Sequence, residues 1–455
     1  MDSLSRRVNC KAACHIVLCL TVTCLAVGAA TTGSVLPLAA DQANSASTQT
    51  AGEEVTVDFA TDLGPVTHRA SGFLHGITPT APGHDLAEAL KPRLFRSAEW
   101  RAFAIYERVK RMGARSQVVV SDSYGYPPNG PWPGDGGDWR RWEQVVGGLV
   151  TAAKENGYIF EWDIWNEPDG KDFWGRGREQ FLETWRRGVL IARRIDPKAI
   201  IVGPSLAQYD RELLTSFLLY AKEHRVLPDI LSWHEFSCAD RQIPAHVAEM
   251  RAVMARNQIA ITRICLNEVI NEDDELSPGA TTWFFSQLEA ARVDGACHAT
   301  WREPDADAGK QGDRLLSGIL TYVDQQPRSA WWAYKGYADI TGRLAEVRPS
   351  TTVAGVAGTD RRHAEARLVL GRMGGAPGAI ALRLIHLDKA SYLAKDGKVH
   401  IVAQRIPAMG WNALVRPVPV MAEDVKPQQG ELVVTLPEFG PSDAYLVEML
   451  QPGGG

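Results

Sequence analysis

Hydrophobic and polar positions follow two different patterns along the chain. In the first, short apolar segments alternate with longer stretches in which apolar residues recur at helical spacing, most clearly at 178–195 and 212–224. This alternation is typical of βα units that build a parallel sheet. The segments that we predict as strands are 71–76, 92–96, 116–121, 160–165, 199–203, 229–233, 262–266 and 295–300.

Eight strand–helix units in one continuous run favour an α/β fold of the (β/α)₈ TIM-barrel type, which typically takes about 250 residues. We place this catalytic barrel at 71–338. A doubly wound open sheet gives a similar pattern, but no glycine-rich phosphate loop follows the first predicted strand. The barrel is therefore the preferred interpretation, and a dinucleotide-binding fold is the weaker one.

The second pattern begins at about residue 339, where alternating apolar and polar residues are separated by Gly, Pro and Asp turns. It predicts an appended antiparallel β-sandwich, an accessory domain at 339–450. The residues of 54–59 alternate in the same way. We expect segment 53–70 to add an N-terminal strand to that sandwich.

The first thirty residues are typical of a secretory signal peptide. Arg6, Arg7 and Lys11 precede a short apolar run that ends in small residues near Ala29 and Ala30. The run is short for a membrane span, which needs about 20 apolar residues, although an uncleaved anchor stays open. Residues 31–52 are rich in Ala, Ser, Thr and Gln and indicate a disordered linker. We therefore expect a secreted or periplasmic protein without stable membrane insertion.

Composition narrows the classes of function. The formal net charge is −5 and the chain has no basic run, which argues against a nucleic-acid partner. Its 14 tryptophans suit stacking on sugar rings, although Trp also packs cores. Cys238, Cys265 and Cys297 lie beyond the leader, and their spacing matches no metal site. We expect buried free thiols, with one bridging pair left open, and neither a metal nor a cofactor.

A pair of glutamates gives the most specific chemical signal. Glu167 lies in Trp-Asn-Glu-Pro at the end of the fourth predicted strand, and Glu268 follows Asn267 at the end of the seventh. In a closed barrel these two strand ends face each other across the catalytic mouth. Two carboxyl groups about 5–5.5 Å apart are what cleavage of a glycosidic bond with retention requires. Glu235 and Glu272 are alternative second carboxylates.

The motif Trp165-Asn-Glu-Pro-Asp169, followed by Phe173-Trp174, resembles glycoside hydrolase family 39, which includes β-xylosidases and α-L-iduronidases. The resemblance continues through the whole predicted barrel and its accessory domain. Its other matching positions are 72–76, Arg96, 202–204, His234 and Trp301. It implies a retaining (β/α)₈ glycosidase of the larger clan, with the acid/base on strand four and the nucleophile on strand seven.

Carried over to this sequence, the resemblance implies that Glu167 protonates the leaving oxygen and then deprotonates water. Glu268 is implied to attack the anomeric carbon and form a glycosyl-enzyme. Asn166 would hydrogen-bond the sugar 2-hydroxyl, and Arg96 and His234 would hold Glu268 ionised and oriented.

Further substrate contacts are expected around the same mouth. Trp301 is a candidate platform under the sugar, and His75, Asp122 and Tyr124 are candidate contacts for its hydroxyl groups. Trp132 and Trp139 lie in or next to a long Pro/Gly-rich loop, where they could stack on substrate or serve only the loop.

The resulting hypothesis is a retaining glycoside hydrolase that cleaves a β-linked glycoside or polysaccharide through a covalent glycosyl-enzyme. An exopolysaccharide-directed endo-glycosidase, rather than an exo-xylosidase, is one alternative. A non-catalytic carbohydrate-binding barrel is another, although both carboxylates are present. An oxidoreductase or aldolase barrel is disfavoured, because the sequence has neither a nucleotide fingerprint nor an evident Schiff-base lysine at a strand end. In each favoured case the partner is an oligo- or polysaccharide.

Overall fold

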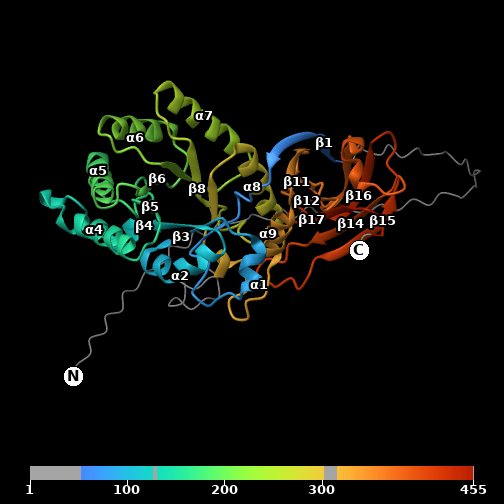
Figure 1. Cartoon of the computed structure of the whole chain (residues 1–455), viewed down its shortest axis with the longest axis horizontal. Helices are drawn as coiled ribbons and strands as arrows, with labels where there is room; N and C mark the ends of the chain where they lie inside the picture. Colours follow the sequence, from blue (N-terminus) through green and yellow to red (C-terminus); the bar gives the residue numbers. More distant parts are fainter. Residues whose placement is uncertain (1–52, 127–130, 302–314, 454–455) are drawn as a thin grey trace, which may run out of the picture. The chain divides into compact units, whose positions relative to one another are not determined.

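The computed structural model describes residues 53–126, 131–301 and 315–453, and the predicted leader and linker lie outside these residues. Eight parallel strands form a closed barrel in sequence order, with the last strand pairing back onto the first (Figure 1). The predicted TIM barrel is confirmed, and every segment predicted as one of its strands overlaps an observed strand. These strands are β2 (Gly72–Leu74), β3 (Leu94–Ala98), β4 (Arg115–Val119), β5 (Glu161–Asp163), β6 (Ile200–Leu206), β7 (Ile230–Glu235), β8 (Arg263–Val269) and β9 (Gly295–His298).

Helices connect successive strands of the barrel, and a last helix, α9, leads from the barrel to the second sheet. They are α1 (His84–Ala87), α2 (Glu99–Arg111), α3 (Val120–Tyr124), α4 (Arg140–Glu155), α5 (Arg178–Ile195), α6 (Arg211–Glu223), α7 (Ile243–Arg256), α8 (Pro278–Ala291) and α9 (Ser329–Asp339). Some of these helices begin at a side chain that caps the first turn. Asp210 caps α6 by accepting a 2.9 Å hydrogen bond from the Leu213 amide, and Ser277 caps α8 in the same way at the Ala280 amide.

Many of the tryptophans serve the core of the barrel. Trp142 Nε1 donates to the Thr184 carbonyl and thereby joins α4 to α5, and Trp185 Nε1 donates to the Val226 carbonyl that follows α6. Both side chains are fully buried, as are those of Trp165 and Trp233. The high Trp content is thus largely explained by packing between helices and strands.

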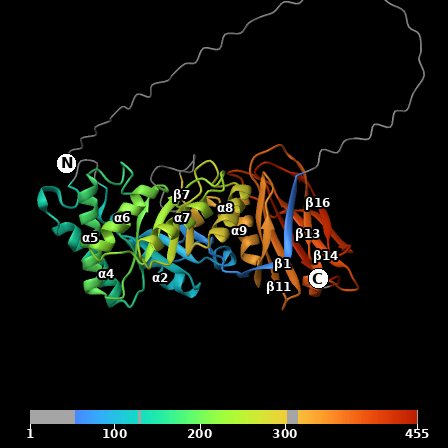
Figure 2. The same ribbon diagram turned by 90° about the horizontal axis from the view of Figure 1, so that it is seen from above.

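The second domain is a nine-stranded sheet in the order β15-β14-β17-β12-β11-β10-β1-β13-β16. Its strands are β1 (Glu54–Pro65), β10 (Arg343–Arg348), β11 (Val353–Asp360), β12 (Glu365–Arg372), β13 (Gly378–Ile385), β14 (Val399–Ile406), β15 (Val418–Val425), β16 (Leu432–Phe439) and β17 (Ala444–Leu450). The predicted β-sandwich is confirmed, and its strand pairs are antiparallel except for one. That exception is β1, which runs parallel to β13 while pairing antiparallel with β10. Figure 2 shows this strand in blue among the orange strands of the C-terminal part.

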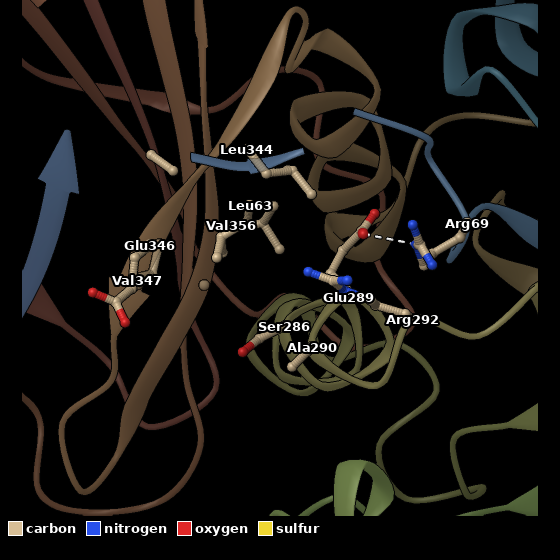
Figure 3. A pocket seen from close by; sticks show the side chains of 12 residues that line it. Leu63, Arg69, Ser286, Glu289, Ala290, Arg292, Leu344, Glu346, Val347 and Val356 are labelled. Carbon is tan, nitrogen blue, oxygen red and sulfur yellow. Dashed lines mark ion pairs between the residues drawn. The ribbon is translucent and has the colours of Figure 1, made fainter. Parts of the chain in front are cut away.

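Helix α8 joins the barrel to this sheet through close backbone contacts. The Gly279 amide donates to the Ser442 carbonyl at 2.9 Å, and Trp283 Nε1 donates to the Gly371 carbonyl at 3.0 Å. Beside this contact, α8 and the β10–β11 strands line a cavity of about 340 Å³ (Figure 3). An ion pair between Arg69 and Glu289, 2.8 Å long, lies at its barrel side (Figure 3).

We expect the substitution Gly279→Ala to destabilise the protein by about 1–3 kcal/mol, the usual cost of forcing extra atoms into a packed core. A β-carbon at this position would lie 2.0 Å from the Arg372 carbonyl oxygen and 2.9 Å from Ser442 backbone atoms, so backbone must move. Gly148→Ala is the control, because nothing lies within 4 Å of its β-carbon in the middle of α4. That change should stabilise by about 0.5–1 kcal/mol. Urea unfolding measures the change in the free energy of unfolding of both variants. Equal changes would contradict a close contact at Gly279.

The three cysteines beyond the leader are buried and free, so the expectation of free thiols is confirmed and the alternative of a bridging pair is wrong. Among the described residues, no helix is long and apolar enough to cross a membrane.

Candidate active site

The carboxyl ends of the barrel strands surround a cavity of about 500 Å³. Both predicted catalytic residues, Glu167 and Glu268, line it. The other residues along its wall are Leu74, His75, Arg96, Val119, Asp122, Asn166, Phe173, Ala207, Phe236, Thr300 and Trp301. Residues that are far apart in the sequence therefore meet here because each follows or ends a neighbouring parallel strand.

The two glutamates lie close together on opposite sides of a buried histidine. One donor atom from each of Glu167, His234 and Glu268 lies within 4.8 Å of the other two. The glutamate side chains are 14% and 13% exposed, whereas His234 is fully buried. Both carboxyl groups can thus reach a molecule in the cavity, and the histidine can act only through them.

Glu167 is held at the cavity by its backbone. Its φ angle is 47°, in the left-handed region that costs a residue with a β-carbon about 1 kcal/mol or more. Its amide donates to the Ser205 carbonyl at the end of β6, at 2.9 Å. This bond ties the segment after β5 to its neighbour and directs the Glu167 side chain toward the barrel axis.

Arg96 links the two glutamate-bearing strands. Its fully buried guanidinium donates to Glu268 Oε1 at 2.6 Å, to Asp163 Oδ2 at 2.8 Å and to Asn166 Oδ1 at 2.6 Å. Burial by itself would lower the pKa of Arg96, but the carboxylates of Asp163 and Glu268 raise it. The guanidinium is therefore a fixed positive charge that lies directly beside Glu268 Oε1.

Asp163 lies beneath this arrangement and anchors it. Its Oδ2 accepts from Arg96 and, at 3.0 Å, from Asn267 Nδ2, while its Oδ1 accepts from Ser205 Oγ at 2.8 Å. Asn267 directly precedes Glu268 in the chain. One buried carboxylate thus connects β3, β5, β6 and β8 below the cavity.

We expect Asp163→Asn to lower kcat about 10²-fold with little change in KM. The change removes the fully buried carboxylate that holds Arg96 and leaves it paired with Glu268. A small displacement of Glu268 is then costly for a reaction that depends on its position. Steady-state kinetics against the best substrate measures the effect.

Glu235→Gln is the matched control for this change. Glu235 is also buried at a strand end, but it accepts hydrogen bonds from Trp233 Nε1 and His246 Nδ1 and does not line the cavity. Its loss should lower the free energy of unfolding and leave kcat within about threefold. Equal losses of kcat in the two variants would show a general effect of buried charge.

The surroundings of Glu167 favour its protonated form. Burial raises its pKa, and Asp172 raises it further, while Arg96 lowers it. His234 Nδ1 and Glu167 Oε1 share a 2.9 Å hydrogen bond, in which either group can be the donor. Burial lowers the pKa of His234 to about 4. The pKa of His234 is thus lowered and that of Glu167 is raised, so both shifts disfavour the charged forms.

Asn166, predicted to contact the sugar, is fixed by two hydrogen bonds. Its backbone N–H donates to Ser121 Oγ at 3.0 Å, and its side-chain Oδ1 accepts from the Arg96 guanidinium. Among the described residues no acceptor bonds to its Nδ2. This group is therefore the part of Asn166 that can donate to a molecule in the cavity.

Three more predicted contacts, His75, Asp122 and Trp301, also line the cavity. Burial lowers the pKa of His75 to about 4, so its ring is neutral. Burial raises the pKa of Asp122 to about 6, against a 2.5 Å hydrogen bond from the Tyr126 hydroxyl. Trp301 Nε1 donates to the Ile270 carbonyl at 2.9 Å, which orients its ring in the wall.

Tyr124 lies outside this wall, which corrects its placement among the cavity contacts. Its ring is buried against Trp142 and Trp165, and its hydroxyl donates to the Pro131 carbonyl at 3.1 Å. The helix α3 begins directly after β4, and its rotation places Tyr124 toward the core while Asp122 reaches the cavity.

The two loop tryptophans also face away from the cavity. Trp132 is buried and its ring packs at 5.4 Å from that of Trp174, and Trp139 is covered by the Arg187 guanidinium. Of the alternative carboxylates, Glu235 is engaged by Trp233 and His246, and Glu272 is exposed. Neither of them lines the cavity.

Sequence reasoning did not select three apolar residues of the wall, Val119, Ala207 and Phe236. It named Leu74 and Phe173 only as positions that match the family and not as contacts of the cavity. Phe236 had a detectable signal, because it follows the predicted strand end that carries His234. Its ring contacts that of Trp301, with centroids 5.2 Å apart. Together they form an aromatic corner beside Glu268.

Two clusters have the donor types of a metal site. Glu167, His234 and Glu268 form one, and Asp360, His363 and Glu365 form another on the second sheet. In the first cluster Arg96 already neutralises Glu268 at 2.6 Å, and a further positive charge beside a buried guanidinium is unfavourable. The arrangement suits acid–base and nucleophilic chemistry better than metal binding.

No protein-family model matches the chain. It is 23% identical over 388 residues to a 3-O-β-L-arabinopyranosyl-α-L-arabinofuranosidase of Bifidobacterium pseudocatenulatum, an alignment that covers 70% of this chain and 38% of that enzyme. The chain spans less than two fifths of the length of the curated relatives that it matches.

Solved structures show the same fold over most of the chain. N2152 from Neocallimastix frontalis superposes with a TM-score of 0.77 at 23% identity, covering 88% of this chain and 100% of that one. A family 39 glycoside hydrolase from Xanthomonas axonopodis pv. citri superposes with a TM-score of 0.63 at 14% identity, covering 88% and 98%. The chain therefore shares its two-domain fold with a family 39 glycoside hydrolase, as the sequence resemblance implied.

Proposed function

We propose that this protein is a retaining glycoside hydrolase that cleaves a β-linked glycoside or polysaccharide. The observation that carries the proposal is the pair of carboxyl groups in one cavity, with oxygens within 4.8 Å of each other. This spacing suits direct attack by one carboxylate and is shorter than the separation of about 6.5–9.5 Å at which inverting enzymes place water between their two groups. The enzymes named among the relatives, arabinofuranosidases and a β-xylosidase, support the same class of reaction.

In the proposed first step, Glu268 attacks the anomeric carbon while Glu167 donates its proton to the departing glycosidic oxygen. The C–O bond to the leaving group breaks, and an ester bond joins the sugar to Glu268. Arg96, at 2.6 Å from Glu268 Oε1, holds this carboxylate in position at the cavity. The raised pKa of Glu167, caused mainly by burial, keeps the proton available.

In the second step, Glu167 removes a proton from water, and the oxygen of that water attacks the anomeric carbon. The ester bond to Glu268 breaks and Glu167 recovers its proton. Asn166 Nδ2 is placed to donate to a sugar hydroxyl as positive charge develops on the ring. His75 and Asp122, which also line the cavity, supply further polar contacts.

A hydrolysis screen with NMR detection of the first-formed anomer tests this proposal. The panel contains aryl β-D-xylosides, aryl α-L-arabinofuranosides, other aryl glycosides and purified polysaccharides, and we expect the released sugar to keep the configuration of the bond cleaved. An inverted product would refute the mechanism. Release of single sugars or of internal fragments separates exo- from endo-action. Binding of glycans without turnover across the panel would instead favour a carbohydrate-binding barrel.

A further inference from the structure

Four arginines gather at the end of the barrel opposite the active site. Arg69, Arg93, Arg115 and Arg263 line a hollow of about 300 Å³, together with Thr67, Val293 and Asp294. Each arginine lies before a barrel strand or at its first residue, so they meet where the strands begin. The catalytic cavity lies at the ends of these strands, and the two places share no residue.

Three of these arginines already form ion pairs with acidic side chains. Arg115 and Arg263 both donate to Glu161 Oε1 and to Asp294 Oδ2, at 2.5–3.0 Å. Arg69 pairs with Glu289, as Figure 3 shows, and donates to the Val293 carbonyl. Their guanidinium groups are thereby held in place.

Arg93 is different, because among the described residues nothing accepts a hydrogen bond from its guanidinium. Its side chain is exposed at the hollow, and it carries five N–H donors. The four arginines and their three acidic partners leave one positive charge in excess. This positive charge also acts on the nearby His68. Burial lowers the pKa of His68 to about 4, and the charges of Lys91 and Arg93 contribute to the lowering.

We propose that this hollow binds a small dianionic oxyanion such as phosphate or sulfate. Tetrahedral oxyanions are bound by guanidinium groups through paired, charge-assisted N–H···O bonds. Arg93 offers all of its N–H donors. Among the described residues, nothing bonds to Nη2 of the neighbouring Arg69 or to Nη1 of Arg263. The volume suits such an ion with water, and the pre-formed ion pairs fix the geometry before it binds. The site is independent of glycoside hydrolysis.

Isothermal titration calorimetry with sodium phosphate and with sodium sulfate, at constant ionic strength, tests the site in the full-length protein. We expect saturable binding to the wild type and a Kd at least about tenfold higher in Arg93→Gln, since charge-assisted hydrogen bonds are lost. Arg416→Gln is the matched control, an exposed arginine of the second domain that has no partner among the described residues. Its Kd should equal that of the wild type.

The same titration with dextran sulfate and with uncharged dextran distinguishes a free ion from a sulfate ester on a polymer. Binding of dextran sulfate alone, with the same dependence on Arg93, would assign the site to the ester. Absence of saturable heat for all of the anions, or equal Kd values for Arg93→Gln and Arg416→Gln, would overturn the proposal. No glycoside is present in these titrations, so failure of the proposed hydrolase function would leave their outcome unchanged.

Discussion

Replacement of Glu268 by alanine is expected to lower kcat by a factor on the order of 10⁵, because the residue proposed to bond to the sugar is removed. The protein should remain folded, since the Glu268 carboxylate lies at the cavity surface and its partner Arg96 keeps its contacts with Asp163 and Asn166. Initial rates on the best aryl glycoside of the screen, with circular dichroism as a folding check, measure the effect.

Added azide should partly restore turnover of an activated aryl glycoside by this variant. The small anion fits the space left by the side chain and attacks the anomeric carbon in a single displacement. The product is then a glycosyl azide of inverted configuration, which NMR identifies. Glu272→Ala is the control, an exposed carboxylate four positions further on, and should keep wild-type activity. If Glu268→Ala retained more than a few per cent of activity without azide, Glu268 would not be the nucleophile.

The barrel was predictable because its signal is repeated. Each unit shows an apolar strand and a helix with one apolar face, and eight repetitions compensate for weak individual segments. The strand β5 shows the limit of this reasoning. The apolar pattern suggested 160–165, whereas the ladder ends at Asp163, because the backbone turns there to bring Asn166 and Glu167 over the cavity.

The second domain was predictable in type, because alternation over many short segments indicates a sandwich. The pairing of its strands was not. Nothing in the local sequence of β1 shows that it lies between β10 and β13, or that one of these pairs is parallel. Pairing between segments some 300 positions apart depends on which apolar faces remain to be covered after both ends of the chain have folded.

Within the site, the sequence predicted the functional residues at the ends of strands but not the residues that lie beneath them. Strand position and motif placed Arg96, Glu167 and Glu268 at one cavity, whereas His234, predicted as a contact there, lies buried behind the two glutamates. Asp163 was not among the predicted site residues, and its contacts explain why it matters beneath the cavity: it holds Arg96 and Asn267. Tyr124 shows the opposite error. Sequence gives the end of a strand but not the rotation of the helix that follows, and here that rotation turns the ring into the core.

Replacement of Glu167 by glutamine is expected to lower kcat/KM about 10²–10⁴-fold for substrates with poor leaving groups, the usual contribution of a general acid. For aryl glycosides whose phenols leave without protonation, the variant should lose far less of the rate of the first step. For these substrates the second step, which needs Glu167 as a base, then limits kcat. A plot of log(kcat/KM) against leaving-group pKa should therefore be much steeper in the variant than in the wild type.

The pH dependence provides an independent test of the same residue. Burial raises the pKa of Glu167, so its acid form persists to higher pH than that of an exposed glutamate. In the wild type, kcat/KM should fall as pH rises through this raised pKa, because the proton for the leaving group is lost. Glutamine does not titrate, so the fall at high pH should be absent in the variant, whereas Glu235→Gln should retain it. A variant that keeps the alkaline fall, or loses the same factor with every leaving group, would show that another group supplies the proton.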